Sequence, residues 1–420
     1  MKFRQFVRVA CVGLPLALSV WTSPSRAAGT GAPWVTAWAT ALQAIPQNPA
    51  LPPLYRAPDV AGRTVRQIVY PTLGGHVVRI HVSNEYGSEP LVIRALSLAP
   101  SAGSAGIDAG RLVQVTFGGR PSLSLPPGGE MDSDPARIEI ARGQPYALSA
   151  YMGEVQRLTG WHRVASQVNY VSLPGNHVDD ASGASYAQRF TQYAWVTGFQ
   201  IEAPGASTVA AIGDSITDGM RSSLDRNRRW PDGLARRLAA SGNTSTAVID
   251  LGISGNRLLN DSACYGDALQ RRFGHDVVQH PGVRTAILLI GINDINFQAT
   301  TPRSGLDCDS PHAGVDADDL IAGYRRVIAE AHAHGIRILG ATLTPASLPA
   351  GREAIRLAAN RWIRTGGAFD GVVDFDAALR DAAHPAQLRS EYDSGDHIHP
   401  NDAGYAVMAD AVPLEALAGR

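Results

Sequence analysis

Residues 209–219 read Val-Ala-Ala-Ile-Gly-Asp-Ser-Ile-Thr-Asp-Gly, a short apolar run that ends abruptly in small and polar residues. The run from Val209 to Ile212 predicts a buried strand, and Gly213 permits tight backbone geometry directly after it. A serine just beyond the carboxyl end of a strand is where α/β domains display a nucleophile, and Ser215 occupies that place. The same serine is equally compatible with capping the next helix, because Ser and Asp are favoured cap residues.

The chain after residue 208 alternates between strand-like and helical stretches. Such alternation is typical of βαβ units, which form a parallel sheet with right-handed crossovers. A ligand site then belongs at the carboxyl ends of the strands. A long irregular segment is expected between the second and third strands. The expected strands are 209–212, 247–251, 285–290, 336–343 and 372–375, and the expected helices lie near 231–240, 318–334, 353–363 and from about 402 onward.

Three further stretches carry small and polar residues in comparable positions. Residues 252–257 (Gly-Ile-Ser-Gly-Asn-Arg) follow the second expected strand, and residues 291–294 (Gly-Ile-Asn-Asp) follow the third. Residues 393–401 (Asp-Ser-Gly-Asp-His-Ile-His-Pro-Asn) precede the last expected helix. Acyl transfer needs a hydroxyl nucleophile, a base, a group that orients the base, and donors aimed at the developing oxyanion.

These stretches supply one residue for each of those roles. Ser215 is the candidate nucleophile and His399 the candidate base, since imidazole exchanges protons near neutral pH. Asp396 lies three residues before the histidine and is the candidate for holding its tautomer. The candidate oxyanion hole consists of the backbone N–H groups of Ser215 and Gly255 and the side-chain amide of Asn293.

Together the four stretches resemble the four signature blocks of the SGNH hydrolases, the GDSL esterase/lipase family. The residues that match the first three blocks are Ser215, Gly255 and Asn293. The Asp-x-x-His of the last block matches Asp396 and His399. The resemblance covers about half of the chain. It implies a flavodoxin-like α/β/α sandwich, no metal or organic cofactor, and hydrolysis of esters, sometimes thioesters or amides, of lipids and acetylated sugars.

A metal site is the alternative interpretation of the last stretch. His397 and His399 stand two positions apart beside Asp393 and Asp396, and such residues can bind zinc. No further histidine or cysteine follows at ligand spacing. We therefore expect no metal here, and we expect His397 to be a structural or rim residue.

Other polar residues near the four blocks are expected to support them. Asp214 is expected to satisfy backbone donors around the nucleophile turn, and Asp294 to brace its loop. Asp250 stands where many family members carry asparagine, a departure outside the proposed catalytic atoms that is expected to matter little. The arginine-rich run 226–229 is expected to be solvated surface, and only weakly a candidate for substrate contact.

The amino-terminal half predicts an all-β sandwich or jelly roll over residues 29–205, because short alternating runs are separated by Gly, Pro, Ser and Asp clusters. Residues 201–207 read as the linker to a hydrolase domain at 206–420. Aromatic residues at strand edges offer a sugar-binding platform, although such residues more often pack in the core; they are Trp34, Trp38, Tyr86, Trp161 and Tyr170. The expected strands are 65–70, 77–83, 91–98, 112–117, 138–140, 146–151 and 168–173.

The first 28 residues predict a cleavable export signal. A basic start precedes an apolar run from Val9 to Trp21, and Ser25-Arg26-Ala27 has the small-x-small form of a cleavage site. The apolar run is too short for a comfortable membrane span, so no stable membrane anchor is expected. The expected location is the periplasm or the medium.

Composition excludes several classes of function. The 420 residues favour two domains, and 45% hydrophobic with 18% charged residues describes an ordinary globular protein. A formal net charge of -1 gives no electrostatic footprint for nucleic acid. Lys2 is the only lysine, so chemistry that needs a lysine, such as Schiff-base formation, is excluded from the mature chain.

Two cysteines, Cys264 and Cys308, remain once the export signal is removed. In an oxidising compartment an isolated pair is a candidate disulfide. The two lie 44 positions apart, and closing a loop of that length stabilises the fold by roughly 4 kcal/mol in the chain-entropy model. The alternative is two unpaired, buried thiols.

The sequence thus predicts a secreted serine esterase that works through an acyl-enzyme, on short acyl groups such as acetyl carried by a small-molecule or polysaccharide substrate. One alternative is a lipase, phospholipase or lysophospholipase acting on longer acyl chains. Another is a non-catalytic carbohydrate-binding protein whose hydrolase fold is inactive. Neither nucleic acid nor a membrane is an expected partner.

Overall fold

The computed structural model describes residues 1, 34–46, 52 and 55–417. The export signal expected at 1–28 lies, apart from Met1, outside the described residues. In the described residues no helix is both long and apolar enough to span a bilayer. The expected division between residues 205 and 206 stays a prediction.

The carboxyl-terminal half is built on a five-stranded parallel sheet in the order β17-β16-β18-β19-β20. These strands are nearly continuous apolar runs because both faces of the sheet are covered. In chain terms the order is 2-1-3-4-5, the flavodoxin-like order, so this part of the fold expectation is confirmed. The strands are β16 (Ser207–Gly213), β17 (Thr246–Gly252), β18 (Val283–Leu289), β19 (Arg337–Ala341) and β20 (Gly371–Val373).

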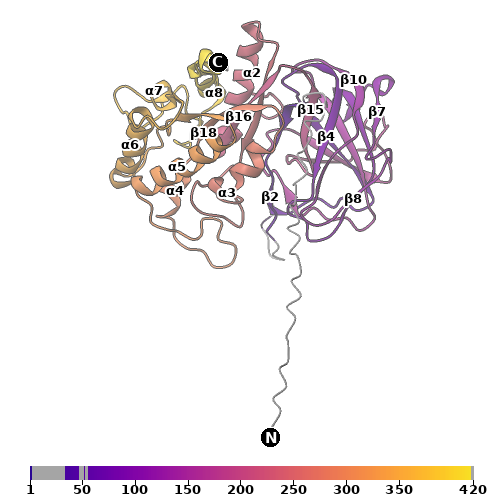
Figure 1. Cartoon of the computed structure of the whole chain (residues 1–420), viewed down its shortest axis with the longest axis horizontal. Coiled ribbons are helices and arrows are strands. Elements are labelled where there is room, and N and C mark those ends of the chain that lie inside the picture. Colours follow the sequence, from indigo (N-terminus) through magenta and orange to yellow (C-terminus); the bar gives the residue numbers. More distant parts are fainter. Residues whose placement is uncertain (2–33, 47–51, 53–54, 418–420) are drawn as a thin grey trace. The chain divides into compact units, whose positions relative to one another are not determined.

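Helices cover both faces of this sheet. The chain crosses from β16 to β17 in one direction and then returns through β18, β19 and β20 in the other. Right-handed crossovers therefore place the helix between β16 and β17 (residues 230–240) on one face and the helices between the later strands on the opposite face. The helix at residues 402–411, which follows the last strand, returns to the first face and packs against residues 230–240. Figure 1 shows the helices around β16 and β18. The helices are α1 (Ser215–Asp218), α2 (Trp230–Ala240), α3 (Leu269–Phe273), the π-helix η3 (Gly274–Val278), α4 (Ile292–Phe297), α5 (Ala317–Ala333), α6 (Ala350–Thr365), α7 (Phe375–Leu379), α8 (Asp402–Ala411) and the 3-10 helix η4 (Leu414–Ala416).

The switch in crossover direction fixes where a ligand can bind. β16 pairs in parallel with both β17 and β18, so the carboxyl ends of these three strands lie next to one another. The loops that follow them diverge to opposite faces and leave a crevice there, which is the usual ligand site of such sheets. Three of the four sequence blocks directly follow these strand ends.

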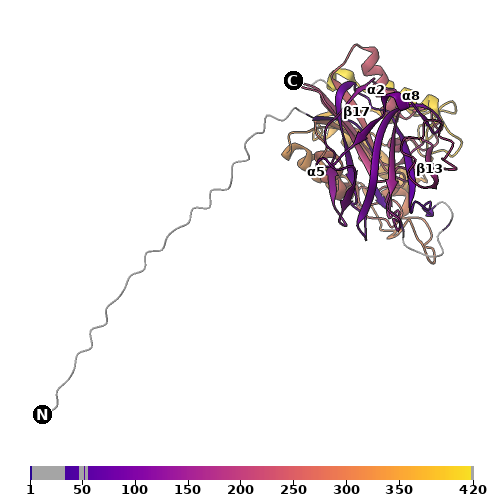
Figure 2. The ribbon, with the colours of Figure 1, turned by 90° about the vertical axis from the view of Figure 1, so that its right-hand side faces the viewer.

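The amino-terminal half consists mainly of two antiparallel sheets, which confirms the all-β expectation (Figure 2). One has the order β1-β15-β4-β10 with β9 beside β4, and the other the order β14-β13-β3-β11-β5-β6 with β7 and β8 beside β5. Side chains from both sheets share one hydrophobic core. The elements are β1 (Trp34–Ala39), β2 (Gln43–Ala44), β3 (Arg63–Val69), β4 (Gly75–Ser83), β5 (Leu91–Gly103), β6 (Gly106–Ile107), η2 (Ala109–Arg111), β7 (Val113–Val115), β8 (Leu123–Leu125), β9 (Glu130–Asp132), β10 (Ala136–Ile140), β11 (Tyr146–Met152), β12 (Gly160–Trp161), β13 (Asn169–Pro174), β14 (Gln188–Phe190) and β15 (Val196–Glu202).

One expectation for this half is wrong, and one of two alternatives is favoured. Strand β15 extends through Glu202, so residues 203–206 alone join it to β16 in place of the longer linker. Of the five aromatics considered for a sugar platform, Trp38, Trp161 and Tyr170 are buried. Burying these rings removes a large apolar area from water, and they therefore serve the core.

Hydrogen bonds join the β-rich half to the parallel sheet. The backbone N–H of Thr36 in β1 donates to the carbonyl oxygen of Pro281 at 2.9 Å. The Thr208 hydroxyl in β16 donates to the Thr36 carbonyl at 2.8 Å. The Thr72 hydroxyl donates to the Val248 carbonyl in β17, also at 2.8 Å. The two halves are therefore packed through β1 against the side of the sheet that carries β17.

Candidate active site

The nucleophile turn is set by the residues on either side of Ser215. Asp214 caps helix α1, its carboxylate accepting the backbone N–H of Ile216 at 3.0 Å. A side chain at Gly213 would collide with the carbonyl oxygen of Leu289, so only glycine fits where β16 and β18 lie side by side. Ser215 is the first residue of the helix and is only 5% exposed. The turn thus presents its hydroxyl in a fixed, nearly buried position.

The structure brings Ser215, His399 and Asp396 into one hydrogen-bonded chain. The distance from Ser215 Oγ to His399 Nε2 is 2.8 Å, and His399 Nδ1 lies 2.9 Å from Asp396 Oδ2. An ionised carboxylate only accepts, so Nδ1 carries the hydrogen and Nε2 is left to accept from the serine hydroxyl. This is the tautomer that a general base needs.

Asp396 is held in its ionised form. Burial raises its pKa, but the backbone N–H and imidazole of His399, together with the N–H of Ile398, outweigh that and hold the pKa well below its usual range. Arg221 adds an ion pair, with its Nε 3.1 Å from Asp396 Oδ2. The carboxylate is therefore available to orient the imidazole and to stabilise its charged form.

The loop after β17 places Gly255 beside the nucleophile turn. Its φ of +87° lies in the left-handed region, and the ring of Tyr265 fills the space a side chain would need. Only glycine satisfies both conditions without strain. Among the described residues, neither the Gly255 nor the Ser215 backbone N–H has a hydrogen-bond acceptor. Both donors remain available for a ligand.

Asn293 lies shortly after the end of β18, where it is the second residue of α4, and it is 8% exposed. Its Nδ2 donates one hydrogen to the carbonyl oxygen of Asn256 at 3.0 Å. That bond fixes the amide against the loop that carries Gly255. An amide nitrogen has two hydrogens, so the second one is left for an oxyanion.

The two supporting aspartates have raised pKa values, and Asp294 also connects two loops. Asp294 accepts the N–H groups of Leu258 at 2.8 Å and Leu259 at 3.0 Å, which ties the loop after β18 to the loop after β17. Burial raises the pKa of Asp294 to about 6 and that of Asp214 to about 7. A carboxyl with a pKa of about 7 is about half protonated at neutral pH, so Asp214 adds less negative charge beside the candidate nucleophile Ser215.

A contact from the β-rich half reaches the nucleophile helix, and sequence reasoning missed it. The imidazole of His162 is buried, with Nε2 3.0 Å from Asp218 Oδ1 at the end of α1 and Nδ1 3.0 Å from the Ala41 carbonyl. The second oxygen of Asp218 accepts the N–H of Ser254 at 2.8 Å. His162 therefore positions both the nucleophile helix and the Gly255 loop.

Replacing His162 by glutamine is expected to reduce the free energy of unfolding at about pH 6 by roughly 3 kcal/mol, since one partner of a buried ion pair is lost. Burial lowers the pKa of His162, but the Asp218 carboxylate outweighs burial and raises it. A raised histidine pKa stabilises the fold below the unfolded-state pKa, and this stabilisation is lost as pH rises through the folded value. Urea unfolding at about pH 6 and pH 9 measures both effects.

The matched control for this variant is His332→Gln. That histidine also pairs with an aspartate, Asp370 at 2.9 Å, but its side chain is 45% exposed. Exposed pairs contribute little, so we expect a change below about 1 kcal/mol. The free energy of unfolding of wild type should exceed that of the His162 variant by less at high pH than at low pH. If this difference stays the same, the ion-pair assignment is contradicted.

The expected disulfide is present between Cys264 and Cys308, whose Cα atoms are 5.1 Å apart. It joins the segment after Gly255 to the segment after Asn293. The loops carrying two of the three candidate oxyanion donors are therefore covalently connected. Tyr265, directly beside the disulfide, is the residue whose ring contacts Gly255.

The structure corrects the expectation for Arg229 and shows the surroundings of Asp250 and His397. Arg229, expected in a solvated run, is buried, with its Nε 2.8 Å from Asp232 Oδ2 and its Nη1 3.2 Å from Asp250 Oδ2. Asp250, which stands where many family members carry asparagine, is thus paired with the cationic side chain of Arg229. His397 is 69% exposed and its Nδ1 lies 2.6 Å from Asp393 Oδ2, which places it at the rim.

Residues 211–407 match the model of the GDSL-like Lipase/Acylhydrolase family. No curated protein matches the chain.

Several solved structures are similar to about half of the chain. An acetylxylan esterase from Geobacillus stearothermophilus is 23% identical, with 50% of this chain and 93% of that one covered and a TM-score of 0.38. A GDSL-like lipase from Bacteroides thetaiotaomicron is 18% identical, with 50% and 88% covered and a TM-score of 0.34. The acetyl xylan esterase AlAXEase is 22% identical, with 49% and 96% covered and a TM-score of 0.37. Residues 211–407 are therefore a domain of the GDSL-like lipase/acylhydrolase family.

Proposed function

We propose that this protein is a secreted serine esterase that hydrolyses short-chain carboxylic esters through an acyl-enzyme. The observation that carries the proposal is the hydrogen-bonded chain from Ser215 Oγ through the His399 imidazole to Asp396. We also propose that the hydrolase domain spans residues 206–420 and the β domain residues 29–205. The mechanism needs no group beyond these side chains and water.

In the first half of the reaction, Ser215 Oγ attacks the ester carbonyl carbon while its proton passes to His399 Nε2. Asp396 stabilises the imidazolium that results. The negative charge on the carbonyl oxygen is held by the N–H groups of Ser215 and Gly255 and by the second Nδ2 hydrogen of Asn293. His399 then donates its proton to the leaving alcohol as the carbon–oxygen bond breaks.

In the second half, water replaces the alcohol. His399 accepts a proton from the water as its oxygen attacks the acyl carbon of the ester formed with Ser215. The same three donors hold the second oxyanion. Collapse of that intermediate releases the carboxylic acid, and the proton returns from His399 to Ser215 Oγ. The enzyme is thereby restored with no net change in its own atoms.

The acyl group is proposed to be short, acetyl above all, and the alcohol to be a carbohydrate. The ring of Tyr265 lies against Gly255 and stacks on Phe297 with ring centroids 5.5 Å apart, so aromatic side chains fill the space beside the oxyanion donors. The 5% exposure of Ser215 favours a small acyl group for the same reason. The disulfide supports export, because such bonds persist in oxidising compartments.

A two-stage experiment tests the proposal. A fluorophosphonate probe is expected to label wild type stoichiometrically and to leave Ser215→Ala unlabelled. Rates on p-nitrophenyl esters from acetyl to palmitoyl are expected to fall with chain length, and acetate release from acetylated xylan then examines the alcohol. If the rate were highest on the palmitoyl ester, the protein would be a lipase instead of a short-chain esterase. If the probe did not label wild type, the hydrolase fold would be inactive and a binding function would remain.

Replacing Asn293 by alanine is expected to lower kcat about a hundred- to a thousand-fold, because one oxyanion donor is lost. KM for p-nitrophenyl acetate should change much less, since the donor contacts charge that develops in the transition state. Asn296→Ala, in the same helix, is the control, and it is expected to stay within about three-fold of wild type. A loss confined to KM would show that the amide binds the substrate and not the oxyanion.

A further inference from the structure

A second group of titratable side chains lies outside the active site, where the β-rich half contacts the hydrolase half. It surrounds a cavity of about 80 Å³. Strand β9 and the end of β4 contribute from one half, and the π-helix η3 contributes from the other. π-helical turns occur often at functional sites. The titratable residues of the cavity wall are His81, Glu85, Glu130, Asp132, His275, Asp276 and His280.

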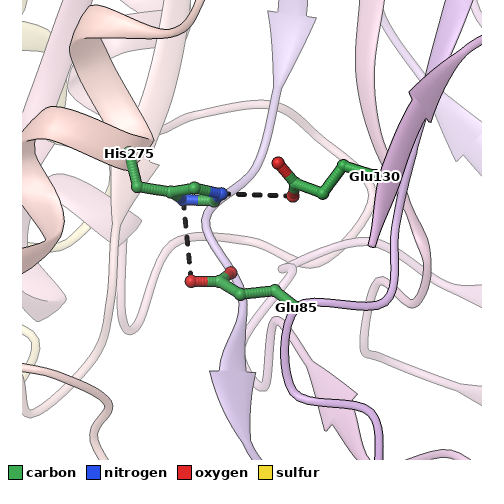
Figure 3. Close-up of side chains that lie close together, drawn as sticks. All are labelled: Glu85, Glu130 and His275. Carbon is green, nitrogen blue, oxygen red and sulfur yellow. Dashed lines mark hydrogen bonds and ion pairs between the residues drawn. The ribbon is translucent and has the colours of Figure 1, made fainter. Parts of the chain in front are cut away.

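Three of these side chains converge as metal ligands do. Figure 3 shows Glu85 and Glu130 directed at the ring of His275. Glu130 Oε1 lies 3.1 Å from His275 Nε2, whereas Glu85 Oε1 lies 3.7 Å from the other ring nitrogen, Nδ1. Glu85 therefore has to turn its carboxylate toward Nε2 to share one ion with Glu130. One ligand atom from each residue lies within 4.8 Å of the other two. All three side chains are at least half buried, and they are far apart in sequence.

His275 is oriented as metal-binding histidines are. Its Nδ1 lies 2.8 Å from Asp276 Oδ1, and a carboxylate that accepts one imidazole N–H typically fixes the tautomer whose other nitrogen binds the metal. The Nε2 lone pair then faces Glu130 Oε1. Two electron-rich atoms at this distance require a cation between them, either a proton or a metal ion.

Glu130 is fixed from its other side as well. Its Oε2 lies 3.7 Å from His81 Nε2, and His81 Nδ1 lies 2.8 Å from Asp132 Oδ1. The carboxylate is therefore held between two imidazoles, each of which has its own aspartate. Ligands whose orientation is already set lose less freedom when an ion binds.

We propose that Glu85, Glu130 and His275 bind one divalent transition-metal ion of the zinc class that links the β-rich half to the hydrolase half. One imidazole and two carboxylates form a donor set that suits Zn²⁺ at its usual three protein ligands. Because Glu85 and Glu130 come from one half and His275 from the other, the ion ties the halves together. Its role is structural, and the esterase reaction does not pass through it.

A buried arginine connects this site to the nucleophile turn. Arg272 Nη1 lies 2.6 Å from Asp276 Oδ2. Its Nη2 donates to the carbonyl oxygen of Gly213 at 2.9 Å, and its Nε donates to Asn256 Oδ1 at 3.1 Å. An ion that fixes His275 and Asp276 therefore also restrains the arginine that holds the end of β16.

Metal binding is measured first on the full-length wild-type protein, which avoids any question of variant folding. The protein is stripped with a chelator and titrated with Zn²⁺ by calorimetry, with metal content counted after gel filtration. The expected result is one tightly bound Zn²⁺ per chain. Co²⁺ at the same site is expected to give visible absorption bands. Wild type that binds neither ion stoichiometrically would overturn the proposal and would show a metal-free salt-bridge network.

Variants then locate the site. Glu130→Gln and His275→Gln are each expected to weaken Zn²⁺ binding at least ten-fold, because each removes a ligand while keeping side-chain size. His332→Gln is the matched control, since it removes an exposed histidine that also pairs with an aspartate, and it should bind like wild type. Equal binding by the double variant Glu130→Gln/His275→Gln would also overturn the proposal.

Thermal unfolding gives a second readout that does not involve ester hydrolysis. A ligand that binds only the folded state raises Tm, and the rise grows with the logarithm of the ratio of ligand concentration to Kd. Zn²⁺ is expected to raise Tm of wild type and of the control, and EDTA should reverse the rise. The Glu130 variant should show no rise. A zinc-independent Tm in wild type would contradict the proposed link between the two halves.

Discussion

Replacement of Ser215 by alanine is expected to lower kcat on p-nitrophenyl acetate about a million-fold. In the proposed mechanism the nucleophile, its base and the orienting carboxylate act as a unit, so loss of the nucleophile alone removes nearly the whole contribution of that unit. The rate that remains over uncatalysed hydrolysis would come from the oxyanion donors and substrate binding. Steady-state assays with active-site titration of wild type measure the ratio and exclude contamination.

The alanine variant should fold normally, because the helix cap is made by Asp214 and not by the serine hydroxyl. A Tm within about 2 °C of that of wild type is the control for normal folding of the variant. The neighbouring Ser222→Ala gives a matched comparison, and its activity is expected to be near that of wild type. Residual activity above a hundredth of wild type would mean that another group attacks the ester.

Replacement of Asp396 by asparagine is expected to lower kcat about ten-thousand-fold. The amide has nearly the same shape, but it lacks the charge that stabilises the imidazolium, and its NH₂ group favours the wrong imidazole tautomer. The 2.9 Å contact between Asp396 Oδ2 and His399 Nδ1 is the geometry on which this expectation rests. Stopped-flow acylation rates on p-nitrophenyl acetate separate this effect from deacylation.

Arg221→Gln provides the control for the charge around Asp396. The arginine contacts the same carboxylate oxygen at 3.1 Å, but its side chain is 58% exposed and its charge is screened by water. Its removal should change kcat less than about five-fold. If Asp396→Asn were equally mild, a backbone group would have to orient His399, and Asp396 would be a loop residue only.

The parallel sheet could be predicted because both of its faces are buried. A strand covered on both sides needs a nearly unbroken apolar run, and 209–212, 247–251 and 285–290 stand out for that reason. Because the strands are parallel, the residues that follow them lie at one edge of the sheet. Ser215 and Asn293 could thus be assigned to a common site before any geometry was known.

Two helical segments and one strand were harder to predict. The segment from Leu269 to Val278 was expected to be irregular, yet it forms α3 and the π-helix η3. Ten residues of mixed polarity carry too few turns for a clear helical period. Strand β15 continued into the expected linker because pairing with β1 and β4 outweighs the local preference of its last residues.

Contacts between distant charged residues could not be predicted at all. His162 and Asp218 are 56 positions apart and belong to different halves of the chain. Glu130 and His275 are 145 positions apart. Of these four residues only Asp218 stands in one of the four blocks, and a single charge in a sequence does not reveal whether a partner will be buried beside it. Arg229 was placed on the surface for the same reason.

The contact of His162 with Asp218 limits how freely this hydrolase can be recombined. If the segment from residue 206 onward were transplanted onto another protein, the Asp218 carboxylate would keep its place at the end of α1 but lose the imidazole that offsets its charge. The side of β17 that β1 contacts would also meet water. Such a chimera would retain every catalytic side chain and still misplace the nucleophile, so modular exchange has to carry the β-rich half with it.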